Sequence, residues 1–397
     1  MISVAKAIQL ILENTTPTVT KKNIFIYDAK NFSLATTLAA DRDYPPFHRA
    51  TMDGYAIRFT DFEKGKEFTI IGEIYAGDNW NYPQKFPDNP AIKIMTGSAV
   101  PDNFDTIIKV EDSVTKKDKV SLQPEKIFPF MNIAKRGEDI LEGNILEKTG
   151  KLIDDSVLII AASMGYRELS VYTPPKVSII GTGNEVIPIE QIPSKTEIRD
   201  SNSILIESLF AKYKAILERK ILLPDDPDTL KKRFSECLDS DFCVITGGVS
   251  AGDKDYIPQA LKEIGVREIF HKTMIRPGKP IWFGKKENTL FFGLPGNPFS
   301  ARVTFKVFIE PAIQKFLHLT TQQRFFLPLL HERKKKHSLE EYFRVKLTNK
   351  EKETYLQEIT SNGSGDFLNS LNSDGIALHP ADKEYLPQGE NVEFLFW

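Results

Sequence analysis

DFCVITGGVSAGDKDYIPQALKEIG, residues 241–265, contains the pattern that decides the fold. Its apolar run, 242–246, is typical of a buried strand, which enters a glycine-rich loop and is followed by a stretch with helical spacing. The same alternation occurs on both sides of it, in KVSIIGTG (176–183), SNSILIESLFAKY (201–213), AILERKILL (215–223), PDTLKKRFSECL (227–238) and TLFFGL (289–294). This order predicts a doubly wound, mainly parallel α/β domain with helices on both faces of its sheet.

Outside this region the pattern changes. Residues 47–140 contain short alternating apolar runs separated by Gly, Pro, Asn and Asp, which predict a small inserted β domain. The tail from about residue 320 contains short strands and predicts a C-terminal β domain, with its charged stretch 331–337 as a solvated loop or strand edge. Residues 3–13 predict a first helix, and residues 299–317 a long apolar helical segment. We therefore expect a multidomain α/β plus β protein.

Composition excludes several function classes. The 397 residues are 41% hydrophobic and 27% charged, which is typical of a globular chain of two to four domains. The net charge of -2 gives no overall basic field, so we expect no nucleic-acid partner. A secretory signal and an apolar run of about 18 residues are both missing, so we expect a cytoplasmic protein without a membrane segment.

The cysteines and histidines do not suggest a transition-metal site. Cys237 and Cys243 have the spacing of neither a zinc site nor a disulfide framework, and we expect two buried thiols. The six histidines are scattered along the chain. A metal bound here would be a hard ion held by carboxylates.

Loops at the carboxyl ends of parallel strands are where α/β sheets bind ligands. Three such loops contain glycine, which lets the backbone approach an anion closely, although a tight turn alone also favours glycine. The candidate substrate-binding residues in these loops are Gly181, Thr182, Gly183, Gly247, Gly248, Ser250, Pro295, Gly296, Asn297 and Pro298. No P-loop, dinucleotide fingerprint or serine nucleophile elbow is present, so the sequence favours neither those cofactor sites nor covalent catalysis.

Charged residues accompany these loops. Carboxylates beside a phosphate site need a bridging cation such as Mg²⁺, and the candidate metal ligands are Glu185, Asp226 and Asp255. Asp226 is equally typical of a helix N-cap, and both roles stay open. Arg276 and Lys279, in the stiff RPGKP segment, predict an oxyanion site. Ser300 could donate to that anion, but capping its helix is the commoner role.

A second kind of loop is PPFHRATMDGYAIR, residues 45–58. It places Asp53 among three potential cations, His48, Arg49 and Arg58. Taken alone, Asp53-Gly54 is typical of a simple chain reversal.

The motifs together carry a specific resemblance. They occur in the order PPFHRATMDGYAIR, IMTGSAVPDNFDTIIKVED, NIAKRGEDILEGN, TGNEV, IRDSNS, ITGGVSAGDKDY, RPGKPIWFG and GLPGNPFSA. In this order they resemble the molybdopterin molybdenumtransferase (MoeA) family, including the matching domain of gephyrin and the plant molybdenum-insertion protein. The resemblance extends over nearly the whole chain.

The resemblance implies an elongated homodimer whose subunit has four domains. The α/β molybdopterin-binding domain would comprise residues 1–20 and 172–320, and a linking domain residues 21–42 and 141–171. The inserted β domain with MDGYA would comprise residues 43–140, and the C-terminal β domain residues 321–397. The active cleft would lie between the α/β domain of one subunit and the inserted domain of the other.

The resemblance also implies an activity. Family members take adenylylated molybdopterin and molybdate, place molybdenum on the dithiolene and release AMP in a Mg²⁺-dependent step. The catalytic residues carried over by position are Asp53, Thr96, Asp139, Glu185, Asp226, Asp255 and Lys279. Arg276 and Ser300 would join Lys279 in binding molybdate or phosphate. Transient contacts with the adenylyltransferase and with acceptor apo-enzymes are also expected.

Three departures from the family pattern stand out: Asn184 replaces an aspartate, Arg276 replaces a lysine, and His48-Arg49 replaces a small polar pair. Two other functions are possible. A molybdopterin adenylyltransferase shares the α/β module but should lack the MDGYA domain and the β tail. A non-catalytic dimeric scaffold should have lost several acids and Lys279, which this chain retains.

Overall fold

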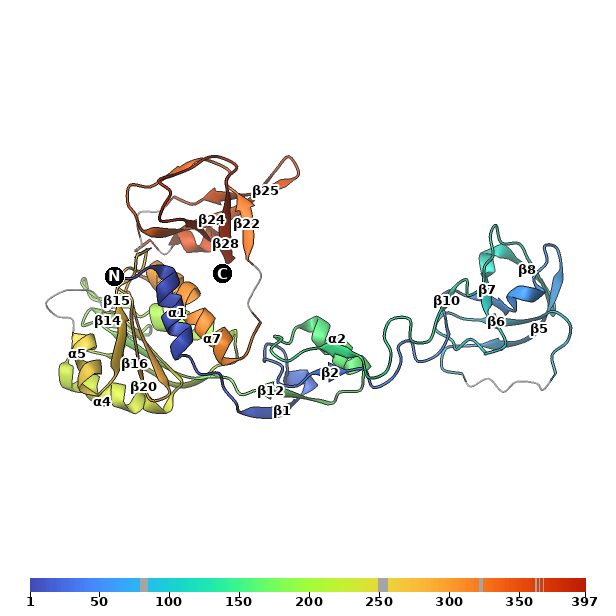
Figure 1. The fold of residues 1–397 in the computed structure, drawn as a ribbon, viewed down its shortest axis with the longest axis horizontal. Coiled ribbons are helices and arrows are strands. Elements are labelled where there is room, and N and C mark those ends of the chain that lie inside the picture. The colour runs from blue at the N-terminus through green and yellow to red at the C-terminus, as the bar shows by residue number, and fades with distance from the viewer. Residues whose placement is uncertain (79–84, 249–255, 321–323, 361–362, 364, 367) are drawn as a thin grey trace. The chain divides into compact units, whose positions relative to one another are not determined.

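The computed structural model describes all residues except 79–84, 249–255, 321–323, 361–362, 364 and 367. The chain divides into two compact units (Figure 1): unit 1 comprises Met1–Thr36, Thr149–Leu158 and Glu168–Trp397, and unit 2 comprises Thr37–Lys148 and Ile159–Arg167. The predicted multidomain α/β plus β architecture is confirmed. The finer division into four domains stays a prediction. Among the helices of the described residues, none combines the length and apolar character that crossing a bilayer requires.

The main sheet of unit 1 has the strand order β16-β13-β17-β21-β20-β18. Its first four strands are parallel neighbours, and the last two join antiparallel, so the sheet is mainly parallel as predicted. The strands are β13 (Lys176–Thr182), β16 (Ile216–Leu223), β17 (Phe242–Thr246), β18 (Arg267–His271), β20 (Trp282–Lys286) and β21 (Thr289–Leu294).

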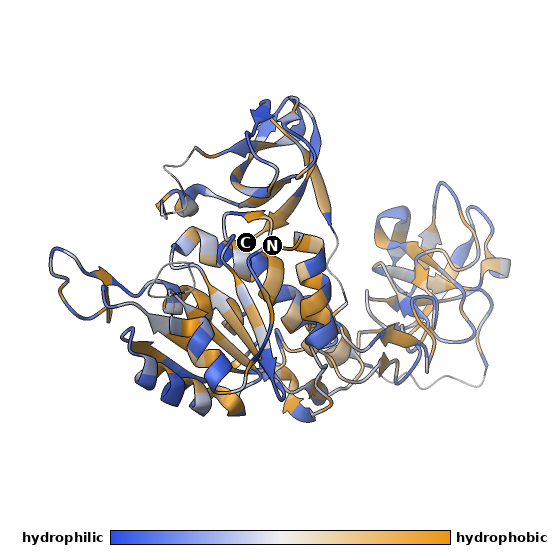
Figure 2. Cartoon of the chain, turned by 60° about the vertical axis from the view of Figure 1, so that its left-hand side comes forward, coloured by the Kyte–Doolittle hydropathy of each residue, from blue (hydrophilic) through white to orange (hydrophobic). Residues whose placement is uncertain are grey.

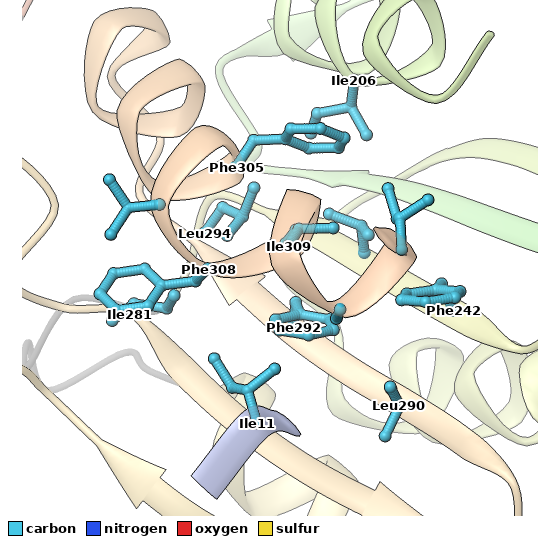
Figure 3. Close-up of a cluster of buried hydrophobic side chains, with 14 of the residues drawn as sticks. Ile11, Ile206, Phe242, Ile281, Leu290, Phe292, Leu294, Phe305, Phe308 and Ile309 are labelled. Carbon is cyan, nitrogen blue, oxygen red and sulfur yellow. The ribbon is translucent and has the colours of Figure 1, made fainter. Parts of the chain in front are cut away.

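Helices cover both faces of this sheet because its strands are apolar on both sides. In β17, Phe242 and Val244 belong to one buried cluster, whereas Cys243 and Ile245 belong to the other. The first cluster (Figure 3) is completed by α1 (Val4–Asn14), α3 (Asn202–Ala211), α6 (Pro298–Thr304), the π-helical η5 (Phe305–Ile309) and α7 (Glu310–Phe316). The second is completed by α4 (Pro227–Ser235) and α5 (Tyr256–Glu263).

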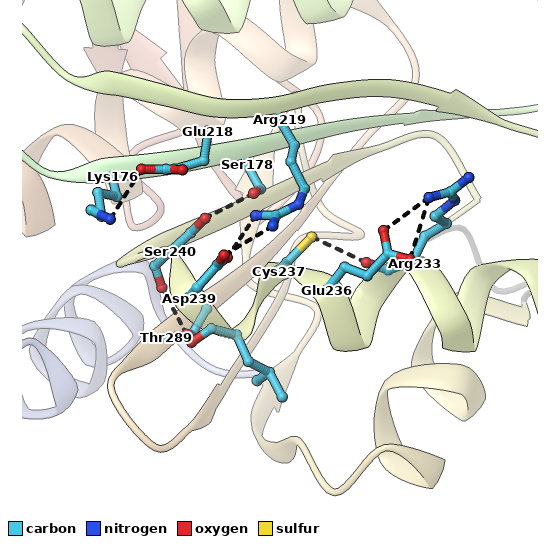
Figure 4. A network of polar contacts seen from close by, with 11 residues as sticks. Lys176, Ser178, Glu218, Arg219, Arg233, Glu236, Cys237, Asp239, Ser240 and Thr289 are labelled. Atoms are coloured by element: carbon cyan, nitrogen blue, oxygen red, sulfur yellow. Dashed lines mark hydrogen bonds and ion pairs between the residues drawn. The ribbon is translucent and has the colours of Figure 1, made fainter.

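Polar side chains at the amino ends of the strands of this sheet form a network of their own. Figure 2 shows hydrophobic residues concentrated in its strands and hydrophilic residues on the outer helices. At the amino ends of the strands, Arg219 forms two hydrogen bonds to Asp239, and Ser178 bonds Ser240 at 2.8 Å (Figure 4). Cys237 and Cys243 are buried free thiols beside this network, as predicted. The polar groups at the amino ends of the strands bond to one another, so we expect the ligand site at the carboxyl ends.

The tail forms a second sheet, with the order β19-β24-β26-β28-β22 and with β25 beside β24. Its strands are β19 (Ile275–Arg276), β22 (Phe325–Pro328), β24 (Glu340–Lys350), β25 (Glu353–Glu358), β26 (Gly375–His379) and β28 (Asn391–Phe396). A separate pair joins β23 (Arg333–Lys334) to β27 (Tyr385–Leu386). Because β19 belongs to the RPGKP segment, the tail sheet takes up a piece of the α/β region, which the sequence did not predict.

One expectation for the tail was wrong in part. Within the charged stretch 331–337, Lys334 and Lys336 are exposed, as a solvated strand edge requires. The side chain of Arg333, however, is only 9% exposed and Lys335 is buried. The Arg333 side chain can be largely buried because its guanidinium forms hydrogen bonds with Glu341, Glu358 and His379.

Unit 2 contains the predicted inserted β region. Its sheet has the order β7-β4-β6-β5-β9-β8. The strands are β4 (Gly54–Ile57), β5 (Glu67–Ile74), β6 (Pro90–Ile94), β7 (Thr106–Lys109), β8 (Ser113–Lys116) and β9 (Lys119–Leu122). Short pairs β2 (Leu38–Ala39) with β11 (Ile145–Glu147) and β3 (Arg49–Ala50) with β10 (Ile133–Ala134) complete it. In unit 1, β1 (Lys21–Phe25) pairs with β12 (Glu168–Tyr172), and helix α2 (Asp155–Ser163) passes from one unit to the other.

Candidate active site

A cavity of about 810 Å³ lies at the carboxyl ends of the parallel strands in unit 1, and we call it the strand-end cavity. The glycine loops after β13, β17 and β21 all contribute to it. Predicted residues in its lining are Thr182, Glu185, Gly247, Gly248, Pro295, Gly296, Asn297 and Pro298. Gly181, in β13, and Gly183, in the loop that follows, are buried but do not line the cavity. Ser250 and Asp255 lie outside the described residues.

Gly247 is required by the close packing of two of these loops. Its φ is +88°, and a Cβ at this position would lie 2.4 Å from the backbone oxygen of Thr182. Only glycine tolerates both the left-handed backbone and this approach. The loops after β13 and β17 therefore meet through their backbones.

The two described carboxylates that we predicted as metal ligands have different surroundings. Glu185 lines the strand-end cavity. Asp226 does not, and its carboxylate caps α4 by accepting a hydrogen bond from the Thr229 N–H at 2.9 Å. That contact lowers the pKa of Asp226. Of the two roles left open for Asp226, the cap is therefore the one that the structure describes.

Asn184, in the loop after β13, has a structural contact. Its Oδ1 accepts a hydrogen bond from the Asp225 N–H at 3.1 Å. The side chain thus ties the loop after β13 to the loop before α4. An amide performs this task without adding negative charge beside the cavity.

Sequence reasoning missed Asp200 and Asn202, which also line the strand-end cavity. Asp200 accepts a hydrogen bond from the Ser203 N–H at 3.0 Å, at the start of α3. Asn202 Nδ2 donates to the Gly296 carbonyl at 2.7 Å and so holds the loop after β21. The signal was present in IRDSNS, where two short polar residues precede an apolar helix, a pattern typical of a cap.

A second cavity, of about 730 Å³, adjoins the first, and we call it the cationic cavity. Pro280, Pro295 and Asn297 line both cavities. The charged residues in its lining are Arg276, Lys279, Arg333, Arg344, Glu341 and Glu358. These four cations and two carboxylates give the cavity a net charge of +2.

The structure brings Arg276, Lys279 and Ser300 together in the cationic cavity. Arg276 and Lys279 are exposed, whereas Ser300 is buried in the first turn of α6. Sequence reasoning missed the partners from the tail, Arg333, Glu341 and Arg344. Arg344 is 2% exposed, and its guanidinium lies 3.5 Å from the centre of the Phe299 ring. An arginine at an inward position of the apolar alternation YFRV was the available signal.

Asp53 and Thr96, which are both exposed, meet in unit 2. One carboxylate oxygen of Asp53 accepts hydrogen bonds from the Thr96 hydroxyl at 2.6 Å and from the Thr96 N–H at 2.7 Å. These contacts lower the pKa of Asp53, so it is an ionised carboxylate at neutral pH. Asp139 is exposed in the same unit, where its N–H donates to the Tyr44 carbonyl.

Gly54 is needed here for packing, not for a turn conformation. A Cβ on Gly54 would lie 2.1 Å from the Ile108 carbonyl oxygen on the neighbouring strand β7. The chain reversal that Asp53-Gly54 alone suggested is therefore not what the glycine provides. Of the neighbouring cations, Arg58 pairs with Asp61 at 3.8 Å, and His48 accepts a hydrogen bond from the Arg136 N–H.

Comparison with known proteins agrees with this arrangement. The chain matches the MoeA N-terminal region (domain I and II) over residues 2–165, the probable molybdopterin binding domain over residues 178–315, and the MoeA C-terminal region (domain IV) over residues 327–397. A molybdopterin molybdenumtransferase from Haemophilus influenzae is 32% identical over 291 residues, which cover 73% of this chain and 71% of that protein. The chain belongs to the molybdopterin molybdenumtransferase family.

Other members of this family match over greater lengths. The molybdopterin molybdenumtransferase of Synechococcus elongatus is 32% identical over 376 residues, 91% of this chain and 90% of that protein. The crystal structure of a molybdopterin biosynthesis MoeA protein from Pyrococcus horikoshii is 26% identical, covers 100% of both chains and has a TM-score of 0.84. The resemblance drawn from the motifs is thus confirmed for the family and the fold.

Proposed function

We propose that this chain is an enzyme that inserts molybdenum from molybdate into adenylylated molybdopterin and releases AMP. Its relatives are named molybdopterin molybdenumtransferases. The observation that carries the proposal for this chain is the pair of adjoining cavities in unit 1. One is built from glycine loops at strand ends, and the other has a net charge of +2, which complements the dianion molybdate.

Each cavity suits one part of the reaction. Glycine loops and the start of α3 provide backbone groups for phosphate at the strand-end cavity. Arg276 and Lys279 would hold molybdate next door. Holding both substrates side by side converts an encounter between two molecules into a reaction within one complex. The bond broken is the phosphoanhydride, attacked by water or a molybdate oxygen, and AMP leaves. The two dithiolene sulfurs bond to molybdenum as it loses one oxygen, either as water with the two thiol protons or to the attacked phosphorus.

Magnesium is a further part of the proposal. Among the residues that the structure describes, no group of three or more His, Cys, Asp or Glu side chains could hold a metal ion. Mg²⁺ is commonly bound through one or two carboxylates and completed by substrate phosphates. Glu185 and Asp200 are both described carboxylates of the strand-end cavity; Asp200 accepts the Ser203 N–H, and we assign this role to Glu185. When bound, Mg²⁺ would neutralise phosphate charge.

We also propose that the active form is a homodimer in which Asp53 acts at the strand-end cavity of the partner subunit. Asp53 and that cavity belong to different compact units of one chain. Two-fold dimers are the commonest oligomers of soluble proteins. We further expect a cytoplasmic enzyme that contacts the adenylyltransferase and acceptor apo-enzymes transiently.

The activity is tested with purified protein, adenylylated molybdopterin, molybdate and Mg²⁺, with AMP release as the readout. We expect turnover by the wild type and none by Asp53→Ala, whereas Asp102→Ala, a change at another exposed aspartate of unit 2, should be active. Formation of the adenylate from ATP would indicate an adenylyltransferase instead. Binding without turnover would favour the scaffold.

A mixing experiment tests the shared site. Asp53→Ala is expected to be inactive, and Lys279→Ala, assayed at molybdate well below its Kd, should retain about a tenth of the wild-type rate. In an exchanged 1:1 mixture, half of the dimers are heterodimers with one intact site, so about a quarter of the wild-type rate should return. If the mixture is no more active than the average of its components, the two residues do not act across subunits.

A further inference from the structure

We propose that Glu341 sets the affinity of the cationic cavity, because its carboxylate holds Arg276 and competes with an incoming oxyanion for that guanidinium. This inference rests on the proposed use of the cavity for molybdate. It assigns a role to a residue that lies outside the sequence motifs and does not itself carry the charge that binds the anion.

The backbone places Glu341 opposite Arg276. Strand β19 pairs in parallel with β24, with Ile275 opposite Glu340 and Arg276 opposite Glu341. The Glu340 N–H also donates to the Met274 carbonyl at 3.0 Å. The start of the RPGKP segment is therefore fixed on the strand that carries Glu341, and their side chains meet by register.

The two oxygens of Glu341 face different partners. Oε2 accepts a hydrogen bond from Arg333 Nη1 at 3.2 Å and lies 3.4 Å from His337 Nε2. Oε1 lies 3.5 Å from Arg276 Nε. Burial alone would raise the pKa of Glu341, but Arg333, Arg276 and His337 together lower it, so the carboxylate is ionised at neutral pH.

Arg333 and Arg276 differ in how firmly they are held. Arg333 is 9% exposed, binds Glu358 at 3.1 Å and His379 at 2.8 Å, and lies over the Phe343 ring. The side chain of Arg276 is 58% exposed, and its ion pair with Glu341 is long, at 3.5 Å. Exposed ion pairs of this kind contribute little stability, so an oxyanion can displace this contact.

The consequence is a competition inside the cavity. While the cavity is empty of oxyanion, Glu341 holds the guanidinium of Arg276 near the rim. An oxyanion that takes Arg276 must overcome that attraction and the repulsion of the carboxylate itself. Glu341 thereby lowers affinity and favours release, which suits a site whose contents must be passed on.

The test is calorimetric titration of the full-length protein with sodium molybdate at constant ionic strength. Glu341→Gln is expected to bind molybdate about three- to tenfold more tightly than the wild type, as expected for loss of a nearby like charge in a partly exposed site. Glu393→Gln is the matched control, since Glu393 lies outside the cavity lining and pairs with the exposed Arg324 at the same distance of 3.5 Å. We expect its affinity to be close to that of the wild type.

A double-mutant cycle ties the effect to Arg276. In an Arg276→Ala background, Glu341→Gln should tighten molybdate binding by less than about twofold, because the competed group is gone and only the screened repulsion of the carboxylate remains. Equal tightening by Glu341→Gln and Glu393→Gln, or the same gain with and without Arg276, would overturn the inference. Unchanged or weaker binding by Glu341→Gln would do so too.

Two further outcomes are kept distinct. If the wild type does not bind molybdate, both the proposed oxyanion site and this inference fail. If the wild type binds molybdate and substitution of Glu341 leaves the affinity unchanged, this inference alone fails. Should Glu341→Gln fail to fold, as judged by circular dichroism, Glu341→Asp replaces it. Aspartate keeps the charge for Arg333 but is shorter, and about a twofold tightening is then expected. No change in that variant would overturn the inference.

Discussion

The strand-end cavity and the cationic cavity share three lining residues but are built in different ways. The first is a product of backbone: glycine loops follow neighbouring parallel strands, and Gly247 packs against the Thr182 carbonyl. The second is a product of side chains, in which residues of the RPGKP segment meet charged residues of the tail sheet. A backbone cavity depends on loop conformation, whereas a side-chain cavity depends on charge and on the pairing of distant segments, here β19 with β24.

The largest expected effect is damage to the backbone cavity by Gly247→Ala. The new Cβ would be strained at φ +88° and would clash with the Thr182 carbonyl at 2.4 Å. We expect the free energy of unfolding to fall by about 3 kcal/mol or more, measured by urea denaturation.

Gly296→Ala is the matched control in the same cavity. The nearest atom to its added Cβ would be the Gly247 Cα, at 3.8 Å. A loss of less than about 1 kcal/mol is expected. Equal losses in both variants would mean that the backbone of the strand-end cavity is not tightly constrained.

The next effect is a loss of stability at low pH caused by His379, which contacts Arg333 of the cationic cavity. Burial, helped by the charges of Arg333 and Lys335, lowers the pKa of His379 to about 4. Because the unfolded histidine titrates near 6.5, it binds a proton before the folded one, and stability is lost as the pH falls from about 6.5 towards 4. We expect a loss of about 2 kcal/mol between pH 7 and pH 4.5, measured by denaturation at both values.

His379→Gln isolates this contribution from the titration of other groups. Glutamine has no proton to take up in this range, so the variant should lose less stability on acidification than the wild type. A parallel loss in both proteins would show that His379 is not the group responsible.

A smaller effect is expected for Lys279→Ala. Removal of one cation from the cationic cavity should raise the molybdate Kd about tenfold, measured by calorimetry, without changing the Tm because Lys279 is exposed. Lys262→Ala removes an exposed lysine of α5 instead and should bind molybdate normally. Similar weakening of molybdate binding in both variants would mean that binding depends on the net charge of the protein and not on the cationic cavity.

The smallest effect concerns Asp226, which caps α4 and does not line the strand-end cavity. Asp226→Ala removes the cap of α4 and should lower the Tm by a few degrees, whereas Asp226→Asn should retain it because asparagine caps equally well. If Asp226 only caps, the asparagine variant also retains AMP release. A folded asparagine variant without activity would show that the charge is needed for catalysis.

The parallel strands and the glycine loops of the strand-end cavity were largely predictable from the sequence. Apolar runs with glycine at their ends predicted the parallel strands and the loops that meet at the strand-end cavity, because backbone conformation follows local residue type. Asp226 illustrates the limit: an aspartate before proline fits a helix cap and a metal ligand equally, and only its contact with Thr229 describes what it does.

The set of side chains that forms the cationic cavity was less predictable. Arg276, Lys279 and Ser300 were identified, but Arg333, Glu341 and Arg344 were not, since their positions follow from the pairing of β19 with β24, between residues about 65 apart in the chain. Such long-range register has no local signal. The charged stretch around Arg333 was read as solvated for a similar reason, because two of the three partners of Arg333, Glu358 and His379, lie 25 and 46 residues away.

The short strand β19 gives the RPGKP segment two attachments. Its start is bonded into the tail sheet through β24, and the chain that follows enters the main sheet as β20. The tail is therefore not an exchangeable module. A chimaera carrying the tail of a relative would also need that relative's residues at 275–276, because a graft that mismatches this seam shifts Lys279 as well.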